Sequence, residues 1–233
     1  LTHYERSFRL ARSSVVVPTP TLERLSTYLR YLLELERAGV ETIRSAEIEE
    51  PTGISAAQFR KDLSYFGEFG KPGSGYYVSE LRARIATILK LDRDQLVLLV
   101  GAGNLGAALA AFPGWAQYHL HIAAVFDNNI AKIGRRLWDW EILDIERLAE
   151  VNEKLGAEIG IIAVPAEAAQ SVADRLVAAG VRGLLNFAPA GIRPAPGVAV
   201  RNVSLVQEMA VLTYHLGERS CNRLPDEEPA EDE

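Results

Sequence analysis

Hydrophobic positions along the 233-residue chain change their spacing between its two halves. In the first half they recur at about every third or fourth position, which predicts amphipathic helices. The second half contains short apolar runs, and helical stretches separate most of them: LVLLV, HIAAVFD, EIGIIAVP and GLLNFAP. This alternation predicts a parallel sheet with crossover helices. We therefore expect an α/β fold whose N-terminal part is helical.

The first predicted helix carries a stripe of leucines at helical spacing. They are Leu22, Leu25, Leu29, Leu32 and Leu33. Thr19 can cap this helix, Pro20 suits its first turn, and Gly39 is a stop signal. A single apolar stripe predicts that the helix packs one face against the elements that follow.

Two short helices around a turn come next. One is expected near residues 45–50, a break falls at residues 51–53 (PTG), and the other begins at Ser55. This order is the helix-turn-helix pattern. The turn-rich residues 70–77 predict a hairpin, or wing, and a helix at about residues 79–91 then leads into the second half.

Charge is unevenly distributed along the chain. Residues 224–233 carry six acidic residues and no basic one, which accounts for the whole net charge of −6. The remainder is neutral, so any affinity for DNA must come from a local basic patch. We predict five parts in chain order: a basic arm (1–18), a winged-helix domain (19–92), a Rossmann domain (93–204), a C-terminal helix (205–217) and an acidic disordered tail (218–233).

No apolar run approaches the length of about 20 residues that spans a bilayer, and the N-terminal residues lack the apolar stretch of a secretory signal. The single cysteine, Cys221, cannot form an internal disulfide. We therefore expect a cytoplasmic protein without membrane contact.

A glycine-rich motif follows the first apolar run of the second half. It consists of Gly101, Ala102, Gly103, Asn104, Leu105 and Gly106. The first glycine permits a tight turn, the second lets the backbone approach a pyrophosphate, and the third lets helix and strand pack closely. Asp127 ends a second strand about 20 residues later, where a carboxylate binds ribose hydroxyls and repels a 2′-phosphate. We therefore predict an NAD(H) site. A Rossmann-like domain with another ligand, or with none, stays open as the alternative.

Groups suited to catalysis are missing from the expected site. A dehydrogenase needs a proton donor or acceptor beside the nicotinamide. His119 and His121 come at the start of a strand, away from the carboxyl edge where ligands bind, and they lack a third metal ligand. His3 lies in the predicted arm, His215 is expected in a packing or surface role on the last helix, and Cys221 has no obvious activating partner. We expect no catalytic residue and no metal site, and hence a sensor.

The helix that begins at Ser55 has two different faces. Its core face carries Phe59, Leu63 and Phe66. Ser55 and Gln58 predict a capping box, and Asp62, at the edge of the core face, is expected to pair locally. The polar face and the wing supply the DNA-binding candidates: Gln58, Arg60, Lys61, Ser64, Tyr65 and Lys71.

Each of these candidates suits a helix that lies in a major groove. The two basic residues of the helix are expected at guanine edges or phosphates, the glutamine and the serine at bases, and the tyrosine and the wing lysine at phosphates. An ordinary solvated helix face is the alternative.

The string RKDLSYFGEFGKPGSGY (residues 60–76) closely resembles the winged-helix domain of the Rex family of NADH-responsive bacterial repressors. LSTYLRYLLELE, GAGNLGAAL, VFD and LLNFAP extend the resemblance, in order, over residues 18 to about 216. The resemblance implies a homodimer whose last helix swaps into the partner. It also implies binding to inverted-repeat operators when NADH is low, and release when NADH binds.

An apolar pocket would favour NADH, because the nicotinamide of NAD⁺ carries a positive charge that burial disfavours. We expect Val164, Pro165, Phe187 and Leu205 to line this pocket. Two rival hypotheses remain: a small NAD-dependent oxidoreductase with a helical dimerisation domain, and a nucleotide-binding module such as a CoA-binding Rossmann domain. The missing acid–base group argues against the first, and a ribose-binding Asp127 argues against the second.

The sequence departs from the family at a polar switch. Many members carry an Arg in the first helix, a Tyr after the first Rossmann helix and an Asp before the last helix, and the Asp exchanges partners between the other two. Arg30 is kept here, but Phe112 and Ser204, which precedes Leu205, stand at the other two positions. We expect NADH still to release DNA, with altered coupling.

Overall fold

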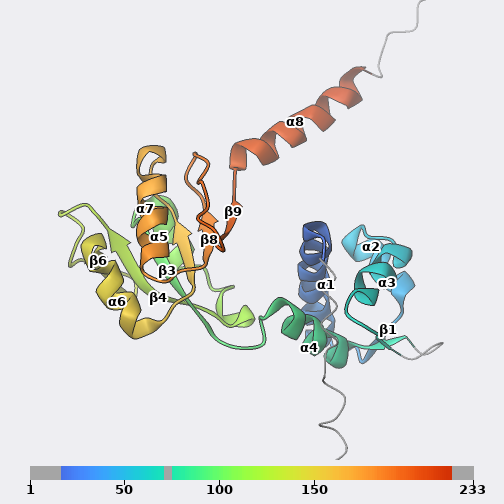
Figure 1. Cartoon of the computed structure of the whole chain (residues 1–233). Coiled ribbons are helices and arrows are strands. Elements are labelled where there is room, and N and C mark those ends of the chain that lie inside the picture. The colour runs from blue at the N-terminus through green and yellow to red at the C-terminus, as the bar shows by residue number, and fades with distance from the viewer. Residues whose placement is uncertain (1–16, 71–74, 222–233) are drawn as a thin grey trace, which may run out of the picture. The chain divides into compact units, whose positions relative to one another are not determined.

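The computed structural model describes residues 17–70 and 75–221, with side chains as far as residue 216. The chain divides into two compact units, and the boundary along the sequence falls between Arg93 and Asp94 (Figure 1). Most of the predicted arm and tail, and Lys71 of the predicted wing, lie outside the described residues.

The N-terminal unit is built from helices and one short antiparallel strand pair. Its helical elements are α1 (Thr19–Arg37), the 3-10 helix η1 (Ser45–Ile48), α2 (Glu49–Thr52), α3 (Ala56–Ser64) and α4 (Val78–Leu89). Its strands are β1 (Thr42–Ile43) and β2 (Tyr76–Tyr77). The end of the predicted wing therefore pairs with a segment more than thirty residues earlier in the chain, with Thr42 opposite Tyr77.

The start of α1 differs from the prediction. Thr19 is the first helical residue and not its cap, because Pro18 occupies the cap position with extended backbone angles. The carbonyl of Pro18 accepts hydrogen bonds from the amides of Thr21 and Leu22, and so takes up the free donors of the first turn.

The core of this unit lies between α1, α3 and α4. Tyr28 and Phe59 are fully buried, and their rings meet edge to face at 4.9 Å. Leu25, Leu29 and Leu32 are buried as the leucine stripe predicts, but Leu22, at the edge of the stripe, is exposed. Tyr28 takes part in the core because its hydroxyl donates a hydrogen bond to the buried carboxylate of Asp62 at 2.9 Å.

A seven-stranded sheet in the order β5-β6-β4-β3-β7-β8-β9 forms the second unit. The predicted strands are β3 (Gln95–Val100), β4 (Leu120–Asp127), β7 (Ile159–Ile162) and β8 (Gly183–Asn186). The sheet also contains β5 (Arg136–Leu137), β6 (Trp140–Asp144) and β9 (Ala199–Asn202). Only β5 runs antiparallel to its neighbour.

Helices cover both faces of the sheet, as β3 illustrates. Its side chains alternate, with Leu98 and Val100 in one core cluster and Val97 and Leu99 in the other. The first cluster includes residues of α6 (Leu148–Leu155) and α7 (Ala166–Ala178), and the second includes α5 (Asn104–Ala110). The neighbours of β3 are β4 and β7, so the strand order reverses there. Ligands of such sheets bind at the carboxyl ends of strands beside this reversal.

The last helix, α8 (Leu205–Cys221), begins directly after β9. It continues four residues beyond the expected end at residue 217, so the first residues of the predicted tail are helical. All of its described side chains, up to Leu216, are exposed although many are apolar. Among the described residues, no helix is long and apolar enough to cross a membrane.

Candidate functional site

The glycine-rich turn joins β3 to α5 in a way that only glycine allows at two positions. Gly101 has φ +104°, and a Cβ at this residue or at Gly106 would collide with a backbone carbonyl. Gly103 differs, because a Cβ built there meets nothing within 4 Å. The first and third glycines therefore build the turn, and the second keeps the space beside the backbone open for a ligand.

Asp127, at the end of β4, is tied to this turn. Its Oδ2 accepts hydrogen bonds from the Ala102 amide at 2.9 Å and from Lys132 Nζ at 3.0 Å, and its Oδ1 accepts one from the Asn129 amide at 2.8 Å. Burial alone would raise the pKa of Asp127, but the hydrogen bonds from Asn129, Lys132 and Ala102 outweigh it and hold the pKa below its usual value. The carboxylate is therefore charged at neutral pH.

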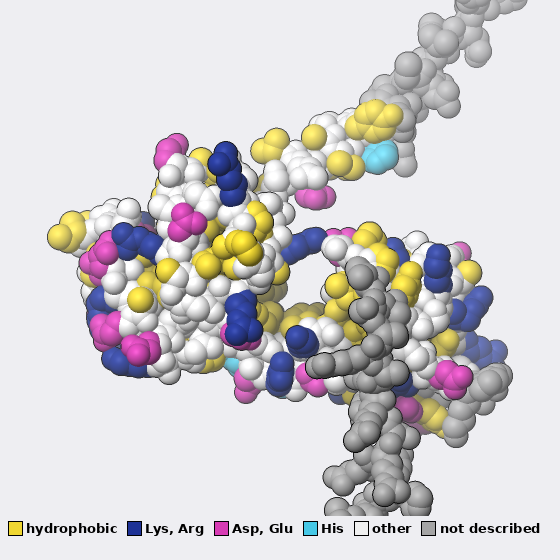
Figure 2. Space-filling view, in the orientation of Figure 1, with side chains coloured by type: hydrophobic (Ala, Val, Ile, Leu, Met, Phe, Trp, Pro, Cys, Tyr) yellow, Lys and Arg dark blue, Asp and Glu magenta, His cyan; other side chains and the backbone are white. Residues whose placement is uncertain are grey.

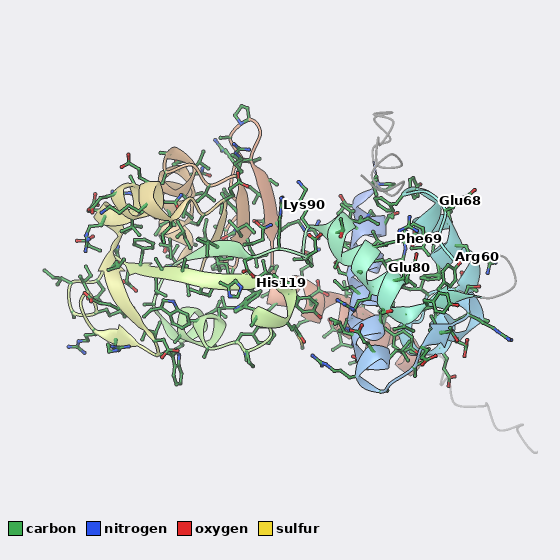
Figure 3. All side chains as sticks on the ribbon, turned by 90° about the horizontal axis from the view of Figure 1, so that it is seen from below. Arg60, Glu68, Phe69, Glu80, Lys90 and His119 are labelled. Carbon is green, nitrogen blue, oxygen red and sulfur yellow. The ribbon has the colours of Figure 1, made fainter. Side chains whose placement is uncertain are left out.

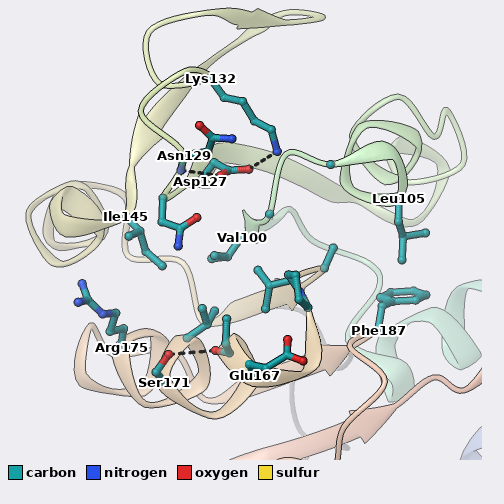
Figure 4. A pocket seen from close by; sticks show the side chains of 18 of the residues that line it. Val100, Leu105, Asp127, Asn129, Lys132, Ile145, Glu167, Ser171, Arg175 and Phe187 are labelled. Carbon is teal, nitrogen blue, oxygen red and sulfur yellow. Dashed lines mark hydrogen bonds and ion pairs between the residues drawn. The ribbon is translucent and has the colours of Figure 1, made fainter.

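A cavity of about 780 Å³ opens at the carboxyl ends of the strands (Figure 4). Its size lies within the range of about 300–1,000 Å³ that is usual for cofactor sites. The residues predicted to contact the cofactor that line it are Gly101, Gly103, Asn104, Leu105, Asp127, Val164, Pro165 and Phe187. Ala102 and Gly106 do not line it, since the first binds Asp127 through its amide and the second packs against Gly101.

The two ends of this cavity differ in chemistry. Figure 4 shows Leu105 and Phe187 at one end and Ser171 and Arg175 at the other. The first end can take an uncharged ring, and the second offers polar groups. Leu205 does not line the cavity, because it stands in α8 and is 71% exposed.

Lys132 is a cavity residue that the sequence analysis missed. It follows β4 in a turn held by three backbone amides. Asn129 donates to Asp127, Ala131 donates to the side chain of Asn129, and Lys132 donates to the carbonyl of Asn129 at 2.8 Å. This turn brings the ammonium group back to Asp127.

The predicted DNA-binding helix is α3, and its polar face is accessible. Arg60, Lys61 and Ser64 are exposed, while Gln58 and Tyr65 are half-buried. Figure 2 shows Lys and Arg side chains on the surface over this part of the N-terminal unit, and Figure 3 labels Arg60. The exposed side chains of Arg60 and Lys61 therefore provide a local basic patch, although the chain without residues 224–233 has no net charge.

Several side chains of α3 already have partners. Arg60 donates to Ser45 Oγ at 2.8 Å, and Ser64 Oγ donates to the carbonyl of Lys61 at 2.7 Å. The capping box forms only in part: Ser55 Oγ accepts from the Gln58 amide, but the side chain of Gln58 donates to Asp62 instead of returning to the cap. The carboxylate of Asp62 is the stronger acceptor.

Asp62 fixes α3 to α1. Its fully buried carboxylate accepts hydrogen bonds from Arg24 Nε at 2.6 Å and Nη2 at 2.7 Å, Gln58 Nε2 at 2.8 Å, Tyr28 Oη at 2.9 Å and Thr21 Oγ1 at 3.3 Å. Burial would raise its pKa, but the hydrogen bonds from these side chains lower it below the usual value. Asp62 pairs within the protein, as predicted, but chiefly with a helix distant in sequence.

The segment that leads towards the wing is held by α4. The guanidinium of Arg84 lies 3.8 Å from the centre of the Phe69 ring and donates to the carbonyl of Glu68 at 2.7 Å. Phe69, Glu68 and the neighbouring Glu80 of α4 are labelled in Figure 3. This arrangement fixes the chain just before the undescribed residues 71–74.

The residues of the expected switch have separate partners. Arg30, in the N-terminal unit, is exposed and 3.5 Å from Glu34. Phe112, in the C-terminal unit, is 51% exposed and packs edge to face on Trp115. Ser204 Oγ accepts a hydrogen bond from the Gln207 amide at 3.2 Å, and so caps α8. This capping role was not predicted.

The two strand histidines share a partner that the sequence analysis missed. Asp94 Oδ1 is 3.0 Å from His119 Nδ1 and 2.9 Å from His121 Nε2. Asp94 precedes β3, and the two histidines stand at the start of β4, so all three lie at the opposite end of these strands from the cavity; Figure 3 labels His119. Within the described ranges, no group of His, Cys, Asp and Glu is arranged to hold a metal ion.

Two family models match the chain. Residues 16–64 match the model described as "Putative DNA-binding protein N-terminus", and residues 92–190 match "CoA binding domain". The first match includes the whole of α3, and the second includes all of the residues that line the cavity.

Curated relatives match over most of their length. A "Redox-sensing transcriptional repressor Rex" from Carboxydothermus hydrogenoformans is 48% identical over 200 residues, which cover 86% of this chain and 96% of the relative. The repressor of the same name from Desulfitobacterium hafniense is 46% identical over 203 residues, which cover 87% and 97%.

Solved structures agree with these relatives. The crystal structure of RSP in complex with β-NAD⁺ and operator DNA has a TM-score of 0.83 and 35% identity, and the match covers 88% of this chain and 95% of that one. RSP in complex with β-NADH has a TM-score of 0.80 and 34% identity, with 88% and 97% covered.

Proposed function

The chain belongs to the Rex family of redox-sensing transcriptional repressors, and we propose that it binds an inverted-repeat operator when NADH is low and leaves it when NADH binds. One observation carries the proposal. This member of the family has an exposed basic helix in one unit. Its other unit contains a cavity that is lined by both Gly103, where the space beside the backbone is open, and the charged Asp127. Family membership confirms the expectation of a regulator rather than an oxidoreductase.

The residues of the cavity fit a dinucleotide. The backbone at Gly103 leaves room for a pyrophosphate, and Asp127 offers a charged acceptor for ribose hydroxyls. The redox signal lies in the nicotinamide ring, which is uncharged in NADH and positively charged in NAD⁺. The apolar end at Leu105 and Phe187 disfavours a positively charged ring, because burial removes that charge from water. The site therefore selects the reduced form.

DNA binding is assigned to α3. Arg60 and Lys61 present cations to base edges or phosphates, while the network of Asp62 holds the helix in place. Because phosphate contacts release counterions, operator affinity must fall steeply with salt. A DNA-binding repressor of this kind acts in the cytoplasm.

A homodimer accounts for α8. Its exposed apolar side chains include Leu205, Val206, Met209, Leu212 and Leu216. An unpartnered apolar helix of this kind requires cover, and a second copy of the chain offers the same helix in return, which gives a swapped two-fold dimer. A dimer also matches an operator built as an inverted repeat.

Coupling between the sites requires that NADH prefer the conformation that does not bind DNA, since equal affinity for both conformations would shift nothing. Phe112 and Ser204 lack the hydroxyl and the carboxylate of the usual polar switch. We propose that coupling here depends less on that exchange of partners and more on the packing of α8.

Binding of a fluorescent inverted-repeat duplex, at fixed salt, tests this function. NADH is expected to release the duplex at concentrations at which NAD⁺ does not. CoA serves as the control for the other ligand class, because the matched domain model carries its name. Absence of duplex binding at every nucleotide ratio would reject the proposal, and release by CoA in place of NADH would reassign the ligand.

A further inference from the structure

An ion pair lies in the cavity at Asp127, the residue proposed to bind a ribose, and we call this part of the cavity the ribose end. Lys132 Nζ is 3.0 Å from Asp127 Oδ2, and both residues line the cavity, where Figure 4 shows their contact. The side chain of Asp127 is almost completely buried, while that of Lys132 is 37% exposed. The carboxylate that should repel a 2′-phosphate therefore has a cation directly beside it.

The position of Lys132 is set by its backbone. The Asn129 turn holds residues 129–132 through amide hydrogen bonds of 2.8 to 2.9 Å, so the backbone of Lys132 is fixed close to Asp127 and its ammonium reaches the carboxylate. An ammonium group has three donors. Asp127 takes one of them, and the others suit a ribose hydroxyl or a phosphate oxygen.

The remaining charged groups that line the cavity form a separate set. Arg175 Nη2 lies 2.8 Å from Glu146 Oε1, and Glu167 stands on α7. Asn128 and Asn129, which also line the cavity, are uncharged. The choice between a 2′-hydroxyl and a 2′-phosphate is therefore made by Asp127 and Lys132 together.

We propose that Lys132 is a specificity-determining residue: the charge of Asp127 offsets its ammonium in the ion pair, and without that charge the ammonium would attract the 2′-phosphate of NADP(H). The inference rests on the proposed NAD(H) site. With Asp127 charged, the pair presents an acceptor and donors to a ribose diol. With Asp127 neutralised, the lysine remains in its turn as a cation of the kind that binds phosphates, and the site gains affinity for NADPH.

Removal of the Lys132 ammonium should change the preference between NADPH and NADH in the direction opposite to neutralisation of Asp127. Removing the ammonium exposes a 2′-phosphate to the unshielded Asp127 carboxylate, so NADPH affinity falls by more than NADH affinity. The two single variants must therefore move the ratio of the NADPH and NADH dissociation constants in opposite directions.

Dissociation constants of NADH and NADPH for the full chain, measured by tryptophan fluorescence quenching, test this inference. The variants are Asp127→Asn, Lys132→Met and the double variant. Lys154→Met is the matched control, because Lys154 pairs with Glu150 on α6 and does not line the cavity. Asp127→Asn should improve NADPH binding by about tenfold, as expected for one charge-assisted hydrogen bond. The double variant should lose this gain in NADPH affinity. Lys132→Met should raise the ratio of the NADPH dissociation constant to the NADH dissociation constant. Lys154→Met should leave both dissociation constants unchanged.

The outcomes separate the two proposals. If the unmodified chain does not bind NADH, the proposed function fails. The assignment of Lys132 is wrong if the unmodified chain binds NADH but Asp127→Asn does not improve NADPH binding. It is also wrong if the double variant keeps the improvement. Lys132→Met keeps Asp127 and decides the question even where Asp127→Asn is unstable, since an unchanged or lowered ratio overturns the inference.

Discussion

Replacing Asp62 with Asn should destabilise the N-terminal unit strongly. The carboxylate is fully buried and accepts two short hydrogen bonds from Arg24, whose own side chain is 27% exposed. An asparagine offers one acceptor in place of two and turns an amide donor towards Arg24 and Tyr28. Removing one member of a buried pair costs about 3–5 kcal/mol. The partial exposure of Arg24 lets water solvate the guanidinium, which reduces the expected loss to about 2–4 kcal/mol.

The effect should also depend on pH in a defined direction. Hydrogen bonds hold the pKa of Asp62 below its usual value of 3.8. The contribution of the carboxylate is therefore fully present above that value and is lost as the pH falls through the lower pKa of the folded state. The difference in unfolding free energy between the natural chain and Asp62→Asn should stay constant between about pH 5 and pH 7 and shrink below about pH 4.

Urea unfolding followed by circular dichroism measures this difference. Glu34→Gln is the matched control on α1, since Glu34 pairs with Arg30 on the surface at 3.5 Å, and its loss should cost less than about 1 kcal/mol. NADH affinity should be unchanged in both variants, because the cavity lies in the other unit. An Asp62→Asn protein as stable as Glu34→Gln would refute the assignment of Asp62 as the anchor of α3.

Three further predictions concern the two sites and the link between them. Arg60→Ala should weaken operator binding by about 1–3 kcal/mol at fixed salt, with NADH affinity unchanged; an equal loss on non-specific DNA would show that Arg60 contacts phosphates only. Gly103→Ala should leave the melting temperature close to that of the natural chain, because the new methyl group meets open space, but should weaken NADH binding at least tenfold, as calorimetry would detect; full NADH affinity would remove the pyrophosphate from this position. Phe112→Tyr combined with Ser204→Asp should change the NADH concentration at which half of the operator is released, and an unchanged midpoint in fluorescence anisotropy would mean that this residue set does not tune coupling.

Much of the fold follows from local patterns. The strands β3, β4, β7 and β8 are continuous apolar runs, because both of their faces are covered by helices. The strands β6 and β9, which lie farther from the centre of the sheet, escaped prediction because they are not apolar along their whole length. β9 (AVRN) is mostly exposed, and β6 (WEILD) mixes charged and apolar residues, so neither has the apolar pattern of a buried strand.

The candidate site could be predicted only as far as its residues belong to a motif. Gly101, Gly103 and Asp127 have a fixed spacing that reflects a fixed turn and strand length. Lys132 has no such spacing, and only the Asn129 turn returns its ammonium to Asp127. Asp62 has the expected local partner in Gln58, but its bond to Arg24 spans 38 residues, and no periodicity along the chain reports a contact between two helices.

We expect the nucleotide and DNA sites to oppose each other through one equilibrium. Linkage requires the effect to be reciprocal, so operator DNA must weaken NADH binding by the same factor by which NADH weakens operator binding. Calorimetric titration of NADH into the full chain, with and without a saturating inverted-repeat duplex, measures this factor directly. We expect a higher NADH dissociation constant in the presence of the duplex and no such rise with a scrambled duplex. An NADH dissociation constant that the operator leaves unchanged would contradict it.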